Sequence, residues 1–314
     1  MPSSISWMKR SIDLRANGKI LLTGEYLVMV GAKALALPVR FGQSMHIEPA
    51  GYPHIHWSSR ENGTTWFTCD LDTRTFSIIT STDIQIATRL CEILRAAKKI
   101  TPGFPVEKGG LDIRVEANYP LRWGLGSSST LISLIASWAG VDKFELFRMV
   151  SKGSGYDIAC TDRDLLLFYQ LKSGKINVGD AHPGKALLNN ACFAFLGKKQ
   201  ETAEEVDAFL YNKNYKNSDI ERISELSESI CIANDPSILC SLMGEHEEIL
   251  GRILKKKRIG KRFPGFPGSV KSLGAWGGDF AMFASEKGNE FIKTWLTQQG
   301  FINIFSYDDI MVPF

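Results

Sequence analysis

Residues 120–129 have the sequence Pro-Leu-Arg-Trp-Gly-Leu-Gly-Ser-Ser-Ser, and an apolar segment that continues to Gly140 follows them. Gly124 and Gly126 permit backbone angles and a close approach that side chains would forbid. Small residues at the start of a helix leave several free N–H groups directed at one point, and the helix dipole makes that point attractive to an anion. The segment therefore predicts a phosphate-binding turn, although by itself it suits a plain helix cap equally well.

The turn differs from other well-known nucleotide-binding motifs. No Gly-Lys-Ser/Thr follows its glycines, so it is not a Walker A loop, and its spacing is not the dinucleotide-binding Gly-x-Gly-x-x-Gly. Residues Asp279-Phe280-Ala281 are similar to the Asp-Phe-Gly of protein kinases. Neither a His-Arg-Asp segment nor a Gly-rich loop with its lysine accompanies them, so we exclude that class as well.

On both sides of the turn, strand-like and helix-like segments alternate without an internal repeat, which indicates an α+β or α/β architecture. Short or alternating apolar runs predict strands over 19–22, 34–39, 111–117, 165–171, 191–196, 280–284 and 302–305. Helical spacing and helix-start residues predict helices over 83–99, 127–140, 289–299 and from Asp235-Pro236 through Ile253. The turn Ser173-Gly174-Lys175 predicts a boundary between two parts of the chain.

The composition is that of an ordinary globular protein, with 44% hydrophobic and 23% charged residues in a chain of 314. A net charge of +3 is too small to indicate nucleic acid or a membrane as a partner. Six scattered cysteines without C-x-x-C spacing disfavour a zinc site or a disulfide scaffold. Residues 1–15 lack the apolar region of a signal peptide, and no run of ~18 apolar residues occurs. We therefore expect a cytoplasmic protein.

Two further segments accompany the turn in a fixed order. Residues 16–26 are Ala-Asn-Gly-Lys-Ile-Leu-Leu-Thr-Gly-Glu-Tyr, and residues 271–279 are Lys-Ser-Leu-Gly-Ala-Trp-Gly-Gly-Asp. With residues 120–129 they resemble the three motifs of the galactokinase, homoserine kinase, mevalonate kinase and phosphomevalonate kinase (GHMP) superfamily. Ser154-Gly155-Tyr156-Asp157-Ile158-Ala159 is similar to the Ser-Gly-x-Asp segment of these kinases and contains the GYDIA letters that name one branch. One such motif is weak evidence, whereas three in order are strong.

The resemblance covers residues 16–279 and implies an α+β, two-domain GHMP kinase fold. Its N-terminal, ATP-binding domain is ribosomal-protein-S5-like and its C-terminal domain is ferredoxin-like, which places them at residues 1–174 and 175–314. The same resemblance implies ATP and Mg²⁺ as cofactors, a small molecule as acceptor and, as a family expectation only, a homodimer.

The resemblance also implies roles for individual residues. Asp157 occupies the position of the catalytic aspartate, which polarises the acceptor hydroxyl or accepts its proton, and Lys19 lies beside it. Glu25 either orients Lys19 or a metal-bound water, or is a plain carboxylate at the end of a strand, and Tyr26 follows it. The nucleotide-binding residues are Gly124, Leu125, Gly126, Ser127, Ser128, Ser129, Gly274, Gly277 and Gly278, of which Ser128 also contacts Mg²⁺. Without the flanking motifs, Asp157 would be interpreted as a helix cap and Lys19 as a surface lysine.

Three positions depart from the family pattern. Asn17 replaces a proline in the first motif, and Trp276 replaces a glycine in the third. Mevalonate kinases carry a Mg²⁺-binding glutamate eleven residues before the aspartate, where this chain has Leu146, with Glu145 one residue away. Glu145 is therefore the candidate carboxylate ligand.

The acceptor is predicted only as a class. Gly24-Glu25-Tyr26-Leu27-Val28 and Gly278-Asp279 resemble phosphomevalonate kinases more than mevalonate kinases, which usually have His after the Glu. We expect mevalonate or phosphomevalonate, and the galactokinase sugar-binding segment is missing. Two alternatives stay open: a diphosphomevalonate decarboxylase, and a non-catalytic relative that senses a nucleotide or metabolite.

Weaker signals have simpler interpretations. His54 and His56 share a strand face but lack a third ligand, so a solvated strand is favoured over a metal site. Residues 252–262 carry seven basic residues and no acid, which is typical of a solvated helix end. A minority hypothesis is that this basic segment attracts a phosphorylated substrate or nucleotide. Cys160 is interpreted as a small buried apolar residue.

Overall fold

The computed structural model describes residues 11–105, 109–197, 202–274 and 279–312. The chain folds into two compact units, and each is assembled from segments that are distant in sequence. The first unit contains residues 1–18, 41–121 and 125–162, and the second contains residues 19–40, 122–124 and 163–314. Strands β1 (Ile12–Thr23) and β2 (Ala34–Ala50) run from one unit into the other.

The first unit is built on a sheet in the strand order β5-β4-β3-β6-β2, with β1 paired to β2. Along this order, neighbouring strands are antiparallel except β3 and β6, which are parallel. In β6, alternate residues Leu111, Ile113 and Val115 are buried, as the alternating pattern predicts. The new strands are β3 (His54–Glu61), β4 (Thr64–Asp72), β5 (Ile78–Ser81) and β6 (Gly110–Ala117).

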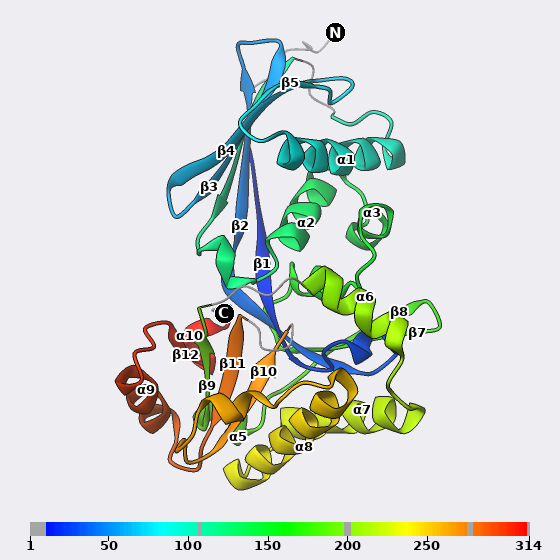
Figure 1. The fold of residues 1–314 in the computed structure, drawn as a ribbon. Coiled ribbons are helices and arrows are strands. Elements are labelled where there is room, and N and C mark those ends of the chain that lie inside the picture. Colours follow the sequence, from blue (N-terminus) through cyan, green and yellow to red (C-terminus); the bar gives the residue numbers. More distant parts are fainter. Residues whose placement is uncertain (1–10, 106–108, 198–201, 275–278, 313–314) are drawn as a thin grey trace. The chain divides into compact units, whose positions relative to one another are not determined.

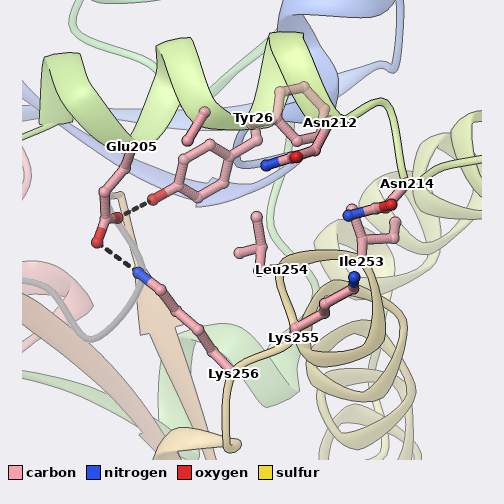
Figure 2. A pocket seen from close by; sticks show the side chains of 10 residues that line it. Tyr26, Glu205, Asn212, Asn214, Ile253, Leu254, Lys255 and Lys256 are labelled. Carbon is pink, nitrogen blue, oxygen red and sulfur yellow. Dashed lines mark hydrogen bonds and ion pairs between the residues drawn. The ribbon is translucent and has the colours of Figure 1, made fainter.

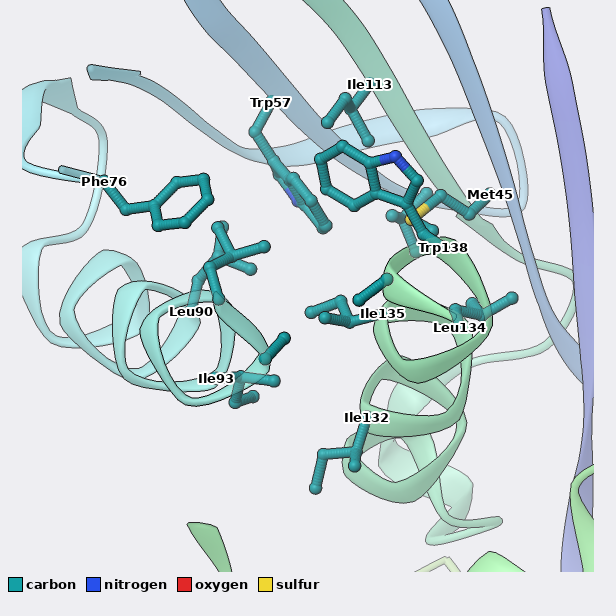
Figure 3. Close-up of a cluster of buried hydrophobic side chains, with 14 of the residues drawn as sticks. Met45, Trp57, Phe76, Leu90, Ile93, Ile113, Ile132, Leu134, Ile135 and Trp138 are labelled. Carbon is teal, nitrogen blue, oxygen red and sulfur yellow. The ribbon is translucent and has the colours of Figure 1, made fainter. Parts of the chain in front are cut away.

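Helices α1 (Ile84–Ile100), α2 (Ser127–Ala139) and α3 (Lys143–Val150) cover one face of this sheet (Figure 1). Asp83 caps α1, because its side chain accepts hydrogen bonds from the N–H groups of Gln85 (2.9 Å) and Ile86 (3.1 Å). Figure 3 shows Trp57 of the sheet together with Trp138 of α2 and Leu90 of α1 in the core between them. Each fully buried large side chain contributes about 2–3 kcal/mol, and this packing fixes the position of α2.

The second unit contains the other ends of β1 and β2, with residues 34–36 of β2 paired to β7 (Leu167–Lys172) and β7 paired to β8 (Lys175–Asp180). A separate antiparallel sheet has the strand order β10-β11-β9-β12. Its strands are β10 (Ser269–Leu273), β11 (Phe280–Ala284), β9 (Ala191–Phe195) and β12 (Ile304–Ser306). Phe283 and Ala281 of β11 are fully buried in the core of this sheet.

Helices surround the strands of the second unit. Helix α8 (Pro236–Leu254) begins where the sequence predicts, with Asp235 accepting a hydrogen bond from Ser237 N at 2.8 Å and Pro236 in the first turn. Leu226 of α7 (Asn217–Ile232) and Leu250 of α8 bury their side chains in one apolar cluster. The remaining helices are α5 (Lys185–Asn189), α6 (Thr202–Asn212), α9 (Asn289–Gln298), α10 (Tyr307–Ile310) and the 3-10 turns η1 (Leu27–Val30), η2 (Leu121–Trp123) and η3 (Ile259–Arg262).

The structure confirms the α+β class. The predicted strands and helices are present, although the last strand spans Ile304–Ser306 rather than residues 302–305. Gly174 lies in the turn between β7 and β8, so the units divide at other positions, and the predicted domains 1–174 and 175–314 stay a prediction. None of the helices in the described part of the chain is long and apolar enough to cross a membrane.

Candidate functional site

The predicted phosphate-binding turn leads directly into α2. Gly126 precedes the helix in the left-handed conformation (φ 91°), which a side chain would disfavour. Ser127, Ser128 and Ser129 then form the first turn of the helix, whose leading N–H groups have no intrahelical acceptor. Ser128 is exposed, whereas Ser129 is buried. The start of α2 thus has the geometry of an anion site.

Asp157 lies at this helix start within the first unit. It belongs to the short helix α4 (Tyr156–Cys160), which Gly155 precedes with φ 90°. The Ser129 hydroxyl donates a hydrogen bond to Asp157 Oδ2 at 2.6 Å. The structure therefore brings together two predicted residues that are 28 positions apart, one from the serine turn and one from the GYDIA segment.

A cavity of about 360 Å³, which the motifs did not predict, opens beside the same turn. Ser127 and Ser128 form part of its lining. Aromatic and apolar side chains supply most of the remainder: Trp57, Trp66, Phe67, Ile86, Leu90, Ile93, Val115, Leu121 and Leu131. An apolar cavity with a few polar groups at one side is the usual form of a small-molecule site. Nothing in the sequence signalled this cavity, because its lining comes from separate strands and helices and the 44% exposure of Trp66 is evident only in the structure.

Lys19 lies in β1, within the second unit. Its ammonium group donates a hydrogen bond to the carbonyl oxygen of Gly124 at 3.2 Å, which ties the first motif to the entry of the phosphate turn. In the first unit, Asn17 N donates to the carbonyl oxygen of Thr161 at 2.8 Å, just after α4. The family's proline has no N–H for this bond, so Asn17 adds a link between β1 and the Asp157 segment. The predicted meeting of Lys19 with Asp157 itself stays a prediction.

Glu25 has partners that its motif does not predict. It is buried in the second unit, where Lys271 Nζ donates a hydrogen bond to its Oε1, and His246 Nε2 lies 3.5 Å from its Oε2. Burial raises the pKa of Glu25 to about 7 against the opposing charge of Lys271. The third motif begins at Lys271 but predicts no role for it, and nothing in the sequence distinguishes a histidine in the middle of α8.

The rest of this buried cluster fixes His246 as a neutral acceptor. Gly24 N donates a hydrogen bond to His246 Nε2 at 3.2 Å, so this nitrogen carries no proton. Burial and the nearby charge of Lys271 hold the pKa of His246 well below its usual value. Glu247 accepts hydrogen bonds from Ser272 N (3.0 Å) and Ile259 N (3.2 Å). The cluster therefore joins the first motif to α8 and β10.

Tyr26 points into a separate pocket of about 170 Å³ in the second unit (Figure 2). Its hydroxyl donates a hydrogen bond to Glu205 Oε2 at 2.5 Å, and Lys256 forms an ion pair with the same carboxylate. Figure 2 shows Lys255 and Asn214 on the opposite wall. The structure thus places Tyr26 with α6 and the end of α8.

The third motif is described only at its edges. Gly274 adopts φ 68°, and its N–H donates to the carbonyl oxygen of Leu21 in β1 at 3.3 Å. Gly277 and Gly278, like Trp276, lie outside the described residues, so their roles stay predictions. Asp279 packs so closely against Gly124 that a Cβ at Gly124 would lie 1.8 Å from its Oδ2.

A metal site was predicted at Ser128 and Glu145. Glu145 is exposed in the first turn of α3, while Leu146 is fully buried in the core. Within the described residues, no group of three His, Cys, Asp or Glu side chains could hold a metal ion. His54 and His56 are therefore not part of such a group. His56 Nδ1 instead pairs with Asp70 at 2.7 Å. The carboxylate role of Glu145 stays a prediction.

No family model and no curated protein sequence matches the chain. Solved structures do match it over nearly its full length. The mevalonate kinase of Methanococcus jannaschii is 17% identical with a TM-score of 0.66, covering 96% of this chain and 99% of that one. Streptococcus pneumoniae phosphomevalonate kinase in complex with phosphomevalonate and AMPPNP is 15% identical with a TM-score of 0.69, covering 93% and 98%.

Lactococcus lactis galactokinase complexed with galactose is more distant, with 11% identity and a TM-score of 0.62 over 97% of this chain and 94% of that one. These identities are low, but the coverage of both chains is almost complete, so the likeness concerns the whole fold rather than one motif. The resemblance predicted from residues 16–279 is thereby confirmed at the level of fold. The chain has the fold of the GHMP kinases.

Proposed function

We propose that this protein is an ATP-dependent phosphotransferase that acts on a small anionic acceptor. The observation that carries the proposal is the 2.6 Å hydrogen bond from Ser129 to Asp157. It sets a carboxylate directly beside a helix start that attracts phosphate. Phosphoryl transfer needs this combination, because charge neutralisation must meet a group that handles the acceptor's proton.

ATP fits the helix start at α2 and the cavity beside it, both of which belong to the first unit. The N–H groups at the start of α2 would hold its phosphates, and the 360 Å³ cavity would take the base against the apolar side chains that line it, among them the exposed Trp66. Ser127 and Ser128 belong to both features, so one nucleotide reaches both. The structural neighbour solved with AMPPNP supports the same choice of nucleotide.

The oxygen groups at this turn also fit Mg²⁺. A magnesium ion usually keeps several waters and needs only one or two protein ligands beside the phosphates of its nucleotide. The exposed Ser128 hydroxyl and the Asp157 carboxylate are such ligands, and Glu145 is a third candidate. Bound with ATP, the ion would neutralise charge on the transferred group.

The chain's own residues then have defined tasks. As the bond between the γ-phosphorus and its bridging oxygen breaks, the acceptor oxygen forms the new P–O bond and ADP leaves. Asp157 accepts the proton of the acceptor hydroxyl, and the hydrogen bond from Ser129 keeps its carboxylate oriented. Lys19 neutralises charge at the phosphate turn, where its ammonium group already bonds to Gly124.

For the acceptor we propose mevalonate or phosphomevalonate. The Gly-Glu-Tyr of the first motif and the Ser-Gly-x-Asp-Ile-Ala at residues 154–159 support this choice, as do the neighbours named for these substrates. A diphosphomevalonate decarboxylase and a nucleotide sensor are the alternatives that the test must separate.

The test measures ADP release from ATP with mevalonate, phosphomevalonate, diphosphomevalonate, galactose and homoserine as acceptors. We expect turnover with one of the first two and a loss of at least a thousandfold in Asp157→Asn. Asp207→Asn is the matched control, because Asp207 is an exposed carboxylate on α6. CO₂ release with diphosphomevalonate would establish the decarboxylase instead. AMPPNP binding without turnover of any acceptor would support the sensor.

Ser129→Ala tests the bond that carries the proposal. Loss of one hydrogen bond to a charged group costs about 1.5 kcal/mol, so kcat should fall about tenfold while ATP affinity changes little. Ser137→Ala, at an exposed position of the same helix, should keep full activity. Equal activity of both variants would contradict a role for Ser129 in orienting Asp157.

A further inference from the structure

The basic segment at the end of α8 lines a hollow that the proposed function does not use. In the second unit, a hollow of about 440 Å³ lies along residues 248–261. Six basic side chains and one acid contribute to its lining: Arg252, Lys255, Lys256, Lys257, Arg258, Lys261 and Glu248. Like charges within one Debye length repel one another, so this collection needs a compensating anion or full solvation.

Internal ion pairs satisfy only part of this charge. Arg252 pairs with Asp219 at 2.5 Å, and Lys256 pairs with Glu205. No ion pair joins Lys255, Arg258 or Lys261 to an acid in the parts of the chain that the structure describes. Arg258 does act at longer range on the buried Glu247, where its charge opposes the rise in the pKa of that carboxyl. Three cations of the hollow therefore remain available to a ligand.

The C-terminal carbonyl groups of α8 are capped by backbone N–H groups rather than by these basic side chains. The carbonyl oxygens of Arg252 and Gly251 accept hydrogen bonds from the backbone N–H groups of Lys255 (3.4 Å) and Lys256 (3.0 Å). Lys255 makes its bond from the left-handed conformation, with φ 53°. Glycine is preferred at such a position, and another residue costs about 1 kcal/mol there. A lysine at this position gives up stability, and its side chain lines both this hollow and the Tyr26 pocket.

Another hollow, of about 260 Å³, adjoins the basic hollow and has a more apolar lining. It shares Arg258 and Lys261 with the basic hollow, and its other lining includes the apolar Phe263, Phe266 and Val270. The buried Glu247 also lines it and already accepts hydrogen bonds from Ser272 N and Ile259 N. An anionic group held by the cations would therefore have an apolar surface beside it. This neighbourhood suits an organic phosphate better than a free inorganic ion.

We propose that the basic hollow at residues 248–261 binds the phosphate or diphosphate group of a small organic ligand. Lys255, Arg258 and Lys261 contact the phosphate oxygens, and the organic part lies against Phe263 and Phe266. Arginine matches two phosphate oxygens at once, while the lysines act as point charges. This site shares no residue with the nucleotide turn and does not depend on the proposed function.

The test is calorimetric titration of the full chain with inorganic pyrophosphate, with AMPPNP present to occupy the nucleotide turn. We compare the wild type with the triple variant Lys255→Gln/Arg258→Gln/Lys261→Gln. The matched control is Lys172→Gln/Lys175→Gln/Lys185→Gln, which removes the same charge at exposed positions of the second unit. We expect pyrophosphate affinity to fall at least tenfold in the first variant and to change less than twofold in the control.

Three results would overturn the site: no binding of pyrophosphate to the wild type, equal affinity in both triple variants and the wild type, or equal losses in both variants. The last result would mean that only overall charge matters. AMPPNP binding is titrated separately in each protein, so a failure of the nucleotide proposal is recognised on its own. Phenyl phosphate should also bind the wild type more tightly than inorganic phosphate, and equal affinities would contradict the organic ligand.

Lys255→Gly separates binding from folding at this site. Glycine relieves the left-handed backbone, so the melting temperature should rise while pyrophosphate affinity falls. A purely structural lysine would predict higher stability with unchanged affinity, which would contradict the proposal.

Discussion

At the scale of single residues, Glu25 and His246 form an opposed titrating pair. Burial raises the pKa of Glu25 from its usual 4.5 to about 7, so between these values the folded protein holds a proton that the unfolded chain has lost. Its contribution to stability therefore falls as pH rises from 4.5 to 7. Burial lowers the pKa of His246 well below 6.5, so its contribution falls as pH drops below 6.5. Between pH 4.5 and 6.5 the two slopes oppose each other.

Single substitutions should reveal how Glu25 and His246 each change the pH dependence of the free energy of unfolding. One titrating group contributes about 1.4 kcal/mol per pH unit. Relative to the wild type, Glu25→Gln should make the free energy of unfolding rise more steeply with pH by about that amount between pH 5 and 6.5. His246→Gln should shift the slope by a similar amount in the opposite direction. Urea denaturation at several pH values measures both.

The double variant is the control for this pair, and its slope should match that of the wild type. Parallel pH profiles for all four proteins would contradict the buried-pair interpretation. Lys271→Met provides a second check, because removing the partner of Glu25 leaves an uncompensated buried carboxyl. That loss should lower stability by about 3–5 kcal/mol at pH 8, where Glu25 must ionise.

At the scale of elements, the entry to the phosphate turn depends on a close approach at Gly124. A Cβ there would lie 1.8 Å from Asp279 Oδ2 and 2.6 Å from its Cγ, and the backbone has φ 70°. Gly124→Ala should therefore displace Asp279 and weaken AMPPNP binding at least tenfold. Gly174→Ala has almost the same backbone angle, φ 74°, with open space around it. It should lose about 1 kcal/mol of stability from the backbone alone and keep its AMPPNP affinity.

Helix boundaries could be predicted from the sequence where a capping residue lies at the end of the helix. Asp83 before α1 and Gly140 after α2 are such residues: α1 begins directly after Asp83, and α2 ends directly before Gly140. Other elements depend on distant partners. Strand β1 runs over Ile12–Thr23, but only 19–22 were predicted, because its first half is exposed on alternate residues and gains its order from pairing with β2. Helix α7 was not predicted, since its apolar positions become evident only against α8.

At the scale of the whole molecule, the motifs predicted the fold and part of the candidate site. Ser129 and Asp157 were named from their motifs, and the structure brings them together. The cavity beside them was not foreseen, because Trp57, Phe67 and Leu90 converge only after the sheet and α1 have packed. His246 was missed for the same reason: a buried histidine and an exposed one look alike in a helical sequence.

Lys19 and Asp157 belong to different units of the chain, and their proposed joint action on one phosphoryl transfer can be tested by a double-variant cycle. If both act on one phosphoryl transfer, each single substitution removes most of what the pair achieves. Lys19→Met should lower kcat/KM at least a hundredfold and Asp157→Asn at least a thousandfold. The double variant should be at most about threefold less active than the less active of the two single variants. Lys19→Met combined with Asp207→Asn should behave like Lys19→Met alone. A double variant that loses the full product of the two single effects would mean that the two groups act independently, because energetically separate sites contribute additively to the barrier.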